Sequence, residues 1–376
     1  MTGSGVDIEV VRDHGRFVEL KPEWDALLAE LGPEASVFMS HYWHDCWWRH
    51  FGADGELHLV VLRRGSRTLG IAPLMRRRFR LYGLPVRALC FPENGNSLHN
   101  DLLLAAAERE QLLAELFGFL DRNRESWDLL HLYRVPADSP NLAGSLSLLG
   151  ARQKSYQLRS AYASPYLEVA GGWNPFHAGR STRVRKTLRN IQNSLARAGS
   201  LEVLHLGSWE QFLEHREGLH RVARQSWTEE LGDSLATPVN AAFFDDLARS
   251  ASREGGLSIW LLLLNGRPVA FEFHLRGFGK QHALRASFDQ EFANLSPGAF
   301  LEMEALKRLF DEPGGVGRFD FGGTTDAYKR RWSDRSRELV SLQLFNGRLY
   351  SRLCAFHATR VIPLLRGVRD RLRKKG

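Results

Sequence analysis

Residues 319–334, FDFGGTTDAYKRRWSD, place side chains able to do chemistry directly after an apolar-alternating segment. The adjacent glycines at 322–323 let a chain turn at the end of a strand without steric cost. Four side chains after this turn could face a cleft and bind or react: Asp326, Tyr328, Lys329 and Trp332. The alternative is a structural loop in which Trp332 is buried.

A second set of reactive side chains lies in GRPVAFEFHLRG, residues 266–277. Strand alternation puts Glu272, His274 and Arg276 on one face. On a central strand beside a cleft these groups would be acid/base candidates. Glu272 is the preferred base if burial raises its pKa, and His274 is the alternate. The alternative is a solvated strand face.

The segment NLSPGAF, residues 294–300, has the signature of a helix start. Ser296 suits the N-cap and Pro297 suits the first turn. Gly298 and Ala299 leave the backbone amides accessible, which predicts a site for a diphosphate. The alternative is an ordinary helix start without a ligand.

A basic helix is predicted at 181–198, where Ser181 can cap the first turn and Gly199 can end the helix. Arg183 and Lys186 lie in its first turns, where basic side chains oppose the helix dipole. An anionic ligand would account for them, and a solvated basic face is the alternative.

Other polar groups admit structural explanations. His41, His44 and His50 could suggest a metal cluster, but we expect a helix whose packed face is formed by tryptophans, with the histidines largely elsewhere and no metal. Asp101 is either a substrate-binding carboxylate or a cap of its own loop. The three cysteines lie far apart, which favours a reducing cytosol.

The net charge of +8 is concentrated at the C-terminus. Residues 346–376 contain nine Arg or Lys and one Asp, so the first 345 residues are neutral overall. This distribution argues against a nucleic-acid partner. The basic tail suits a helix packed on the body, or peripheral contact with a membrane or a membrane synthase. We expect neither a secretory signal nor a membrane span.

The chain of 376 residues is long enough for two domains, and two stretches resemble each other. Residues 57–79 and 257–278 each predict an apolar strand, a tight turn and a second strand; in the latter, Asn265-Gly266 is a strong type I′ turn signal. Helices are expected at 107–123 and 297–310, and further strands at 86–91, 128–133, 201–206, 280–288, 317–322 and 338–345. The expected fold class is α/β, with two tandem domains, each a mixed, mostly antiparallel sheet flanked by helices. We predict domains at 1–165 and 166–345 and a basic amphipathic tail at 346–376.

Several segments together resemble a known family. Six segments occur in the order found in GNAT-superfamily tandem acyltransferases: the aromatic opening at 38–52, the strand LGIAPLMRR, the helix STRVRKTLRN, the hairpin NGRPVAF, the Ser-Pro-Gly helix start and FDFGGTTDAYKRRW. The likeness is to the group related to the cellulose-biosynthesis protein CelD and the FemAB peptidyltransferases. It covers most of residues 36–345.

The resemblance implies two GNAT-like domains and a site for acyl-CoA, most commonly acetyl-CoA, in the second. The strand at 268–275 would pair with the pantetheine through Val269, Phe271 and Phe273, and the strand at 280–288 would splay away. The diphosphate would lie on Asn294, Ser296, Gly298 and Ala299. This loop has only one glycine, unlike the glycine-rich GNAT loop.

The resemblance also implies roles for the opening stretch. Tyr328 would protonate the leaving thiolate, and Lys329 would bind an acceptor anion or stabilise the oxyanion. Glu272 would deprotonate the acceptor. Asp101, Arg183, Lys186, His274, Asp326 and Trp332 are the candidate acceptor-binding residues. We expect the first domain to frame the acceptor.

The leading hypothesis is a cytoplasmic acyl-CoA-dependent N- or O-acyltransferase of a sugar or amino-sugar precursor in polysaccharide or cell-envelope synthesis. The alternatives are a FemAB-like enzyme using aminoacyl-tRNA, and a catalytically silent module that docks on a membrane polysaccharide synthase. We expect no long helical insert between residues 200 and 256, which favours acyl-CoA over tRNA.

Overall fold

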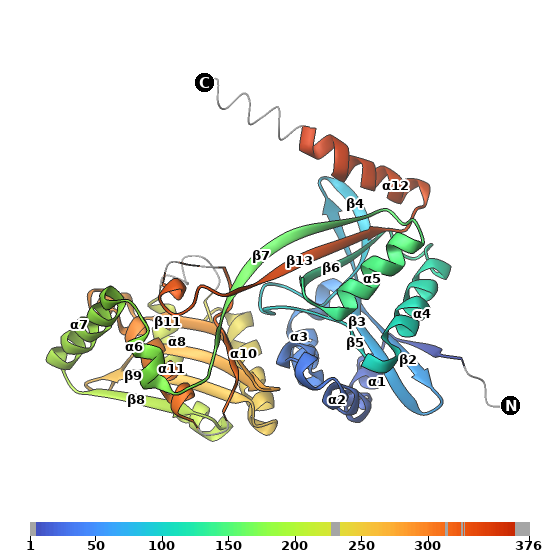
Figure 1. Ribbon diagram of the computed structural model, residues 1–376. Coiled ribbons are helices and arrows are strands. Elements are labelled where there is room, and N and C mark those ends of the chain that lie inside the picture. Colours follow the sequence, from blue (N-terminus) through green and yellow to red (C-terminus); the bar gives the residue numbers. More distant parts are fainter. Residues whose placement is uncertain (1–4, 227–233, 313–314, 325, 327, 365–376) are drawn as a thin grey trace. The chain divides into compact units, whose positions relative to one another are not determined.

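The computed structural model describes residues 5–226, 234–312, 315–324, 326 and 328–364, which form two compact units (Figure 1). Unit 1 comprises Met1–Gly32, Phe38–Tyr162 and Glu338–Gly376. Unit 2 comprises Pro33–Val37 and Ala163–Arg337. Each unit has a mostly antiparallel sheet with helices, which is the expected α/β fold class.

The sheet of unit 1 has the strand order β1-β2-β3-β4-β6-β13, and β5 pairs with β3. Its pairs are antiparallel except for β4 and β6, which are parallel over Ala88–Cys90 and Leu129–His131. The strands are β1 (Asp7–Val11), β2 (Gly55–Arg64), β3 (Arg67–Leu81), β4 (Leu84–Cys90), β5 (Leu103–Leu104), β6 (Leu129–Pro136) and β13 (Ser336–Phe345). The hairpin predicted at 57–79 is therefore confirmed as β2 and β3.

The helices of unit 1 bury aromatic and aliphatic side chains. They are α1 (His14–Glu19), α2 (Lys21–Glu30), α3 (His41–Phe51), α4 (Arg109–Arg122), α5 (Pro140–Ala151) and α12 (Leu349–Phe356). In α3 the tryptophans Trp43 and Trp47 are buried as expected, but His41 and His44 are buried too. Both imidazoles contact the Trp24 ring, and burial lowers the pKa of His44 to about 3. These histidines are therefore neutral packing residues.

The sheet of unit 2 has the order β7-β12-β11-β10-β9-β8. Its strands are β7 (Tyr156–Glu168, whose second half lies in unit 2), β8 (Leu201–Leu206), β9 (Leu257–Leu264), β10 (Arg267–Gly277), β11 (Lys280–Phe288) and β12 (Arg318–Asp320). Asn265 and Gly266 have φ angles of 52° and 74°, so the predicted type I′ turn joins β9 to β10. Only β11 and β12 are parallel.

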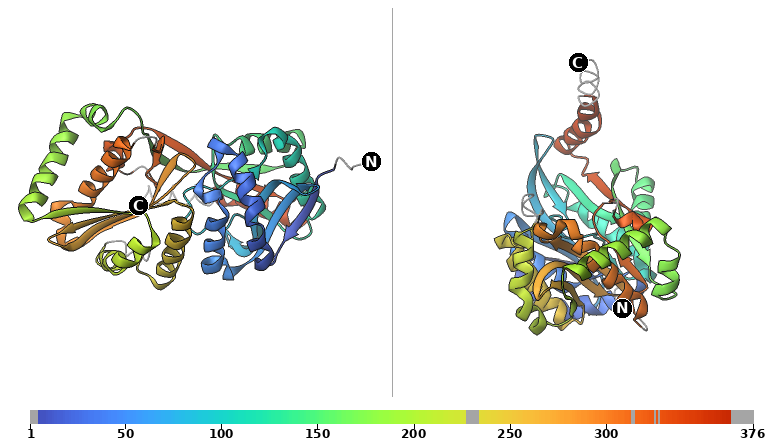
Figure 2. Two further views of the ribbon diagram at one scale, coloured as in Figure 1. Left: turned by 90° about the horizontal axis from the view of Figure 1, so that it is seen from below. Right: turned by 90° about the vertical axis from the view of Figure 1, so that its left-hand side faces the viewer.

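Helices cover both faces of this sheet (Figure 2). One face carries α6 (Trp173–Ala178), α7 (Thr182–Ala198) and α11 (Pro297–Asp311), whose side chains share a core with Trp260 and Leu262. The other carries α8 (Trp209–Arg224) and α10 (Pro238–Arg253), where Phe244 contacts Phe273 of β10. Strand alternation thus sends Phe273 to one face and Glu272 to the other.

The path of β13 differs from the prediction. Residues 338–345 were expected in the second domain, but they belong to unit 1, where β13 pairs with β6 from Leu339 to Phe345. A strand must satisfy its backbone hydrogen-bonding groups, and β6 supplies the partner edge. The boundary expected after residue 165 lies at Tyr162 and Ala163.

None of the helices in the described ranges has the length and apolar character needed to cross a bilayer. Short 3₁₀ turns complete the described structure at Gly32–Glu34, Val37–Met39, Gly52–Asp54, Ala106–Glu108, Gln290–Leu295 and Lys329–Arg331, and a π-helical turn follows α12 at His357–Val361.

Candidate functional site

A cavity of about 380 Å³ lies in unit 2 beside the part of β11 that extends beyond its pairing with β12. The parallel pairing of β11 with β12 stops at His282 and Asp320, whereas β11 continues to Phe288. The volume suits a small-molecule ligand. The walls are mostly apolar or aromatic, with two carboxylates and one arginine: Phe271, Glu272, Ala283, Ala286, Ser287, Phe288, Ala293, Ser296, Gly298, Ala299, Glu302, Phe319, Phe321, Tyr328 and Arg331.

The N-terminus of α11 opens on this cavity. The helix begins at Pro297, and Gly298 and Ala299 line the cavity. Ser296 is not the side-chain cap that the sequence predicted, because it has φ 54° and ψ 50° and its hydroxyl makes no capping bond. Within the part of the chain that the structure describes, no group caps the amides of Gly298 and Ala299. Uncapped amides at the positive end of a helix dipole are suited to an anion.

Two carboxylates from different elements share the cavity wall: Glu272 of β10 and Glu302 of α11. Glu272 accepts a 2.8 Å hydrogen bond from Nε2 of His274. The side-chain amide of Gln281 donates to Nδ1 of the same imidazole, also at 2.8 Å. This amide bond fixes the tautomer with the proton on Nε2, and so directs His274 at Glu272.

Glu302 holds a proton near neutral pH. Burial, and secondly the charge of Glu272, raise its pKa to about 8, although a hydrogen bond from Trp332 and the nearby Arg331 act in the opposite direction. Nε1 of Trp332 donates to Oε2 of Glu302 at 2.6 Å. The site therefore combines an acceptor of protons with a carboxylic acid that can donate one.

Tyr328 lines the cavity and Lys329 does not. Burial, followed by the charge of Glu302, raises the pKa of Tyr328, so its hydroxyl stays protonated. Lys329 Nζ donates to the carbonyls of Gly322 at 2.7 Å and Thr324 at 3.1 Å, and lies 3.2 Å from Asp326 Oδ2. Lys329 and Asp326 thus stabilise the turn after β12, in place of the predicted contact with the acceptor.

The predicted role of the strand at 268–275 is wrong. Its backbone pairs with β9 on one edge and with β11 on the other, so its amides have no edge to offer a ligand. Of its three predicted contacts only Phe271 lines the cavity; Val269 is buried in the core, and Phe273 packs on Phe244. β11 instead extends beyond its pairing with β12, over residues 283–288.

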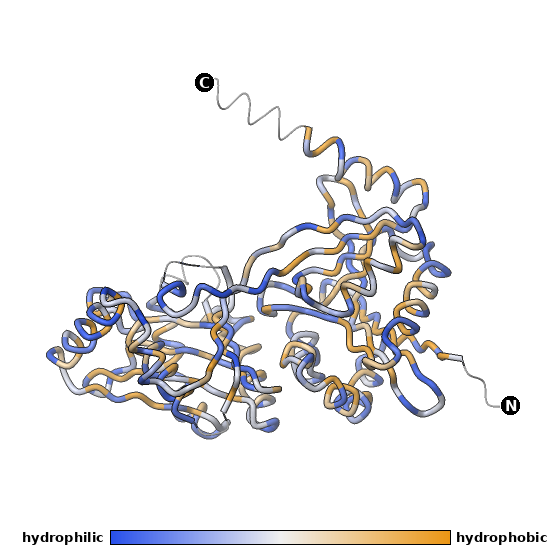
Figure 3. Tube along the Cα trace, viewed as in Figure 1, coloured by the Kyte–Doolittle hydropathy of each residue, from blue (hydrophilic) through white to orange (hydrophobic). Residues whose placement is uncertain are grey.

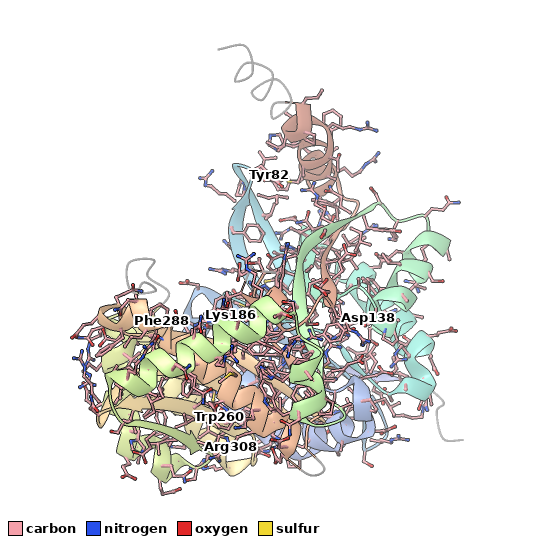
Figure 4. All side chains as sticks on the ribbon, turned by 60° about the vertical axis from the view of Figure 1, so that its left-hand side comes forward. Tyr82, Asp138, Lys186, Trp260, Phe288 and Arg308 are labelled. Carbon is pink, nitrogen blue, oxygen red and sulfur yellow. The ribbon has the colours of Figure 1, made fainter. Side chains whose placement is uncertain are left out.

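The remaining predicted residues lie outside the cavity walls. Asn294 is exposed in the turn before α11, and Ala293 lines the cavity in its place. Trp332 and His274 are buried behind the two carboxylates, as partners of Glu302 and Glu272. Arg183 and Lys186 lie on the exposed surface of α7, where Figure 4 labels Lys186.

Asp101 belongs to unit 1 and has structural partners. It accepts hydrogen bonds from the Leu102 amide at 2.7 Å, from the Ser139 hydroxyl at 2.6 Å and from the Asn141 amide group at 3.0 Å. These bonds join the loop before β5 to the start of α5. The loop-capping alternative therefore accounts for Asp101.

Unit 1 contains a corresponding parallel strand pair, in which β4 pairs with β6 as β11 pairs with β12 in unit 2. Beyond the pairing of β4 with β6, the loop at 91–102 occupies the gap. Asn100 donates its backbone amide to the Arg134 carbonyl at 3.0 Å and its side-chain amide to the Tyr133 carbonyl at 3.1 Å. In unit 1 the loop therefore hydrogen-bonds to β6 beyond the end of β4.

Sequence reasoning missed Glu302 and Arg331. The signal for Glu302 was available, because it lies in the apolar stripe of α11 that includes Ala305 and Leu309. A glutamate at such a position needs a buried partner or a function. No local pattern marks Arg331, which lies among other basic residues.

Comparisons with known proteins agree with this geometry. Residues 182–330 match the family model of the acetyltransferase (GNAT) domain. No curated protein sequence matches the chain. The FemX crystal structure is similar with a TM-score of 0.61 and 13% identity, over 89% of this chain and 98% of FemX.

Two further structures are similar at TM-scores of 0.50. One is a tandem GNAT protein from the clavulanic acid biosynthesis pathway, 12% identical over 91% of this chain and 99% of that chain. The other is L-PGS from Bacillus licheniformis, 13% identical over 90% and 96%. The narrower resemblance to CelD stays a prediction. Residues 182–330 of the chain therefore match the acetyltransferase (GNAT) domain, and the whole chain shares its fold with FemX and with a tandem GNAT protein.

Proposed function

We propose that unit 2 binds acyl-CoA, with acetyl-CoA as the leading candidate, and that the diphosphate of the ligand lies on the backbone amides of Gly298 and Ala299. The observation that carries this proposal is the start of α11, which has no side-chain cap and opens on the cavity beside residues 283–288 of β11. Arg331 adds a positive charge at the same wall. Backbone amides, the helix dipole and a guanidinium are together the groups that bind phosphates well.

The pantetheine arm lies along residues 283–288 of β11 in this proposal. β12 pairs with residues 280–282 of β11 and does not pair with residues 283–288. An extended amide chain can pair with a strand edge as an added strand would. The apolar walls formed by Phe288, Phe319 and Phe321 would then enclose the acyl group.

The reaction is transfer of the acyl carbon from sulfur to a nitrogen or oxygen of the acceptor. Glu272 removes the acceptor proton as the new bond forms, and His274 holds the carboxylate in place. The carbon–sulfur bond then breaks, and the leaving thiolate takes a proton from Tyr328. Protonated Glu302 lies in the same wall and can return that proton to Tyr328.

The acceptor in this proposal is a sugar or amino-sugar precursor of a polysaccharide or the cell envelope. The resemblance to CelD supports a sugar as the acceptor. The carboxylate of Glu272 supports an amino group over a hydroxyl as the acceptor group, because a carboxylate attracts an ammonium before it deprotonates it. The acceptor class is tested separately from acyl-CoA binding.

A second candidate is aminoacyl transfer from charged tRNA. Two observations favour it: the fold shared with FemX over 89% of the chain, and the exposed basic surface of α7 that includes Arg183 and Lys186. An RNA backbone would neutralise those side chains. The cavity beside α11, where the helix start has no side-chain cap for an anion to displace, favours acyl-CoA.

The test is release of free CoA thiol, followed with a thiol-reactive dye, from acetyl-CoA and longer acyl-CoAs in the presence of amino sugars and nucleotide sugars. We expect thiol release that needs both substrates and that is lost in Glu272→Gln. Glu304→Gln is the matched control, because it removes one carboxylate from α11 outside the cavity. Absence of acyl-CoA binding together with transfer from aminoacyl-tRNA would replace the first candidate by the second.

A further inference from the structure

The outer face of α12 carries large apolar side chains that the protein leaves in solvent. Leu349, Leu353, Phe356 and Leu364 are 87%, 55%, 59% and 70% exposed, and we call these four residues the outer stripe. Leu349, Leu353 and Phe356 are spaced by four and three residues, which puts them on one side of α12, and Leu364 follows the π-helical turn. Figure 3 shows hydrophobic and hydrophilic residues interleaved along this segment. A contiguous apolar stripe of this kind marks an interaction surface.

The inner face of the same helix is packed on unit 1. Ser351, Cys354 and Ala358 are buried, and the last two join a core cluster with Leu81 and Val86. The Ser351 hydroxyl also donates to the Asp128 carbonyl at 2.6 Å. The helix is therefore held in a fixed orientation that turns the outer stripe away from its own core.

Basic side chains flank the outer stripe. Arg348 is paired with Glu125 at 3.3 Å. For Arg352 and Arg360, both exposed, no carboxylate partner exists among the residues that the structure describes. The described residues 346–364 contain three arginines and no Asp or Glu. The surface therefore has an excess of positive charge beside its apolar residues.

The β3–β4 hairpin extends this surface. Arg159 donates to the Tyr82 hydroxyl at 2.9 Å and to the Ala358 carbonyl at 3.4 Å, so one side chain joins the hairpin tip to the helix. Tyr82, at this tip, is labelled in Figure 4. Tyr350 donates to the Pro85 carbonyl at 2.6 Å. Arg78 and Arg80 of β3 add two further positive charges to the hairpin.

We propose that α12, with its outer stripe and flanking arginines, binds the surface of an anionic phospholipid membrane. An amphipathic helix lying in the membrane interface has these features: an apolar face toward the acyl chains and basic residues beside the head groups. The charge favours this occupant over an ordinary protein partner, because Arg352 and Arg360 have no carboxylate partner among the described residues. The apolar stripe favours it over a nucleic acid. The proposal is independent of the proposed acyl-transfer reaction.

The test is co-sedimentation of the full chain with vesicles of phosphatidylglycerol and phosphatidylcholine, compared with vesicles of phosphatidylcholine alone, at low and high salt. We expect binding to the anionic vesicles that weakens with salt, because salt screens the charges. Leu353→Ser with Phe356→Ser should weaken binding at least about tenfold. Arg352→Gln with Arg360→Gln should weaken it by about 30-fold, at about fivefold for each arginine.

The controls are Leu213→Ser, which removes a 49% exposed leucine from α8, and Arg253→Gln on α10. Both should bind vesicles like the parent protein, and circular dichroism should show all variants folded. Equal binding to neutral and anionic vesicles, or unchanged binding of the α12 variants, would overturn the proposal. Loss of self-association in these variants, with no vesicle binding by the parent, would assign the stripe to a second copy of the chain instead.

Discussion

Replacement of Glu302 by Gln should make the protein more stable at neutral and alkaline pH. The substitution keeps the shape of the side chain and an oxygen that can accept the bond from Trp332 Nε1. It removes a carboxyl whose pKa is raised from its ordinary value of 4.5 to about 8 by burial and by Glu272. The folded chain therefore holds a proton on Glu302 that the unfolded chain releases.

The size and sign of the effect follow from this difference. Between about pH 4.5 and pH 8 the folded state binds one more proton than the unfolded state, so the free energy of unfolding falls as the pH rises. The slope is about 1.4 kcal/mol per pH unit, which amounts to about 3 kcal/mol at pH 7 and about 5 kcal/mol above pH 8. Below about pH 4.5 the cost disappears. Glu302→Gln should recover this cost at each pH.

The assay is urea denaturation of parent and variant at steps from pH 5 to pH 9, followed by circular dichroism. We expect the difference in the free energy of unfolding to grow from near zero at about pH 5 and to level off above about pH 8. Glu304→Gln removes the same charge from the same helix and should leave the difference flat. A flat difference for Glu302→Gln would mean that Glu302 is ionised without penalty, and would refute the protonated carboxyl in the cavity wall.

Three further substitutions test individual side chains. Tyr328→Phe should lower kcat by about 10²-fold without changing acyl-CoA affinity, and thioesters of more acidic thiols should lose less; an equal loss for all thioesters would exclude Tyr328 as the proton donor. Lys329→Met should lower the free energy of unfolding by about 2 kcal/mol, since it removes a buried ammonium that holds three oxygens, whereas the exposed Arg330→Gln should not. Arg331→Gln should weaken CoA binding about tenfold and reduce its salt dependence; unchanged affinity would remove Arg331 from the diphosphate site.

The sequence predicted those parts of the fold that depend on local chemistry. The Asn265-Gly266 turn is set by the positive φ angles that a type I′ turn requires. The start of α11 is set by Pro297, whose ring suits the first helical turn. The strand at 201–206 and the helix at 182–198 are likewise determined by their own side-chain pattern. Glu272 and Tyr328 could be proposed because they lie on such predictable elements.

Features that depend on pairing between distant strands could not be predicted in the same way. The pattern of β10 shows which side chains share a face, but it does not show that β9 and β11 pair with its two backbone edges. The pantetheine contact was therefore predicted on a strand whose edges are both occupied. The pairing of β13 with β6 joins residues about two hundred positions apart, so the pattern of residues 338–345 alone places them next to unit 2. Lys329 was predicted to face the acceptor because a basic residue after a glycine turn resembles a ligand site, whereas it binds the carbonyls of that turn.

The most direct measurement is calorimetric binding of CoA to Ala299→Asp. A carboxylate at this first-turn position favours the helix dipole, so the variant should be as stable as the parent or more stable by about 0.5 kcal/mol. The same charge would repel a bound diphosphate, so the affinity for CoA should fall at least about tenfold while the affinity for pantetheine, which has no diphosphate, stays unchanged. Val239→Asp, in the first turn of α10, should change neither affinity. CoA binding to Ala299→Asp at the parent affinity would contradict the placement of the diphosphate on α11.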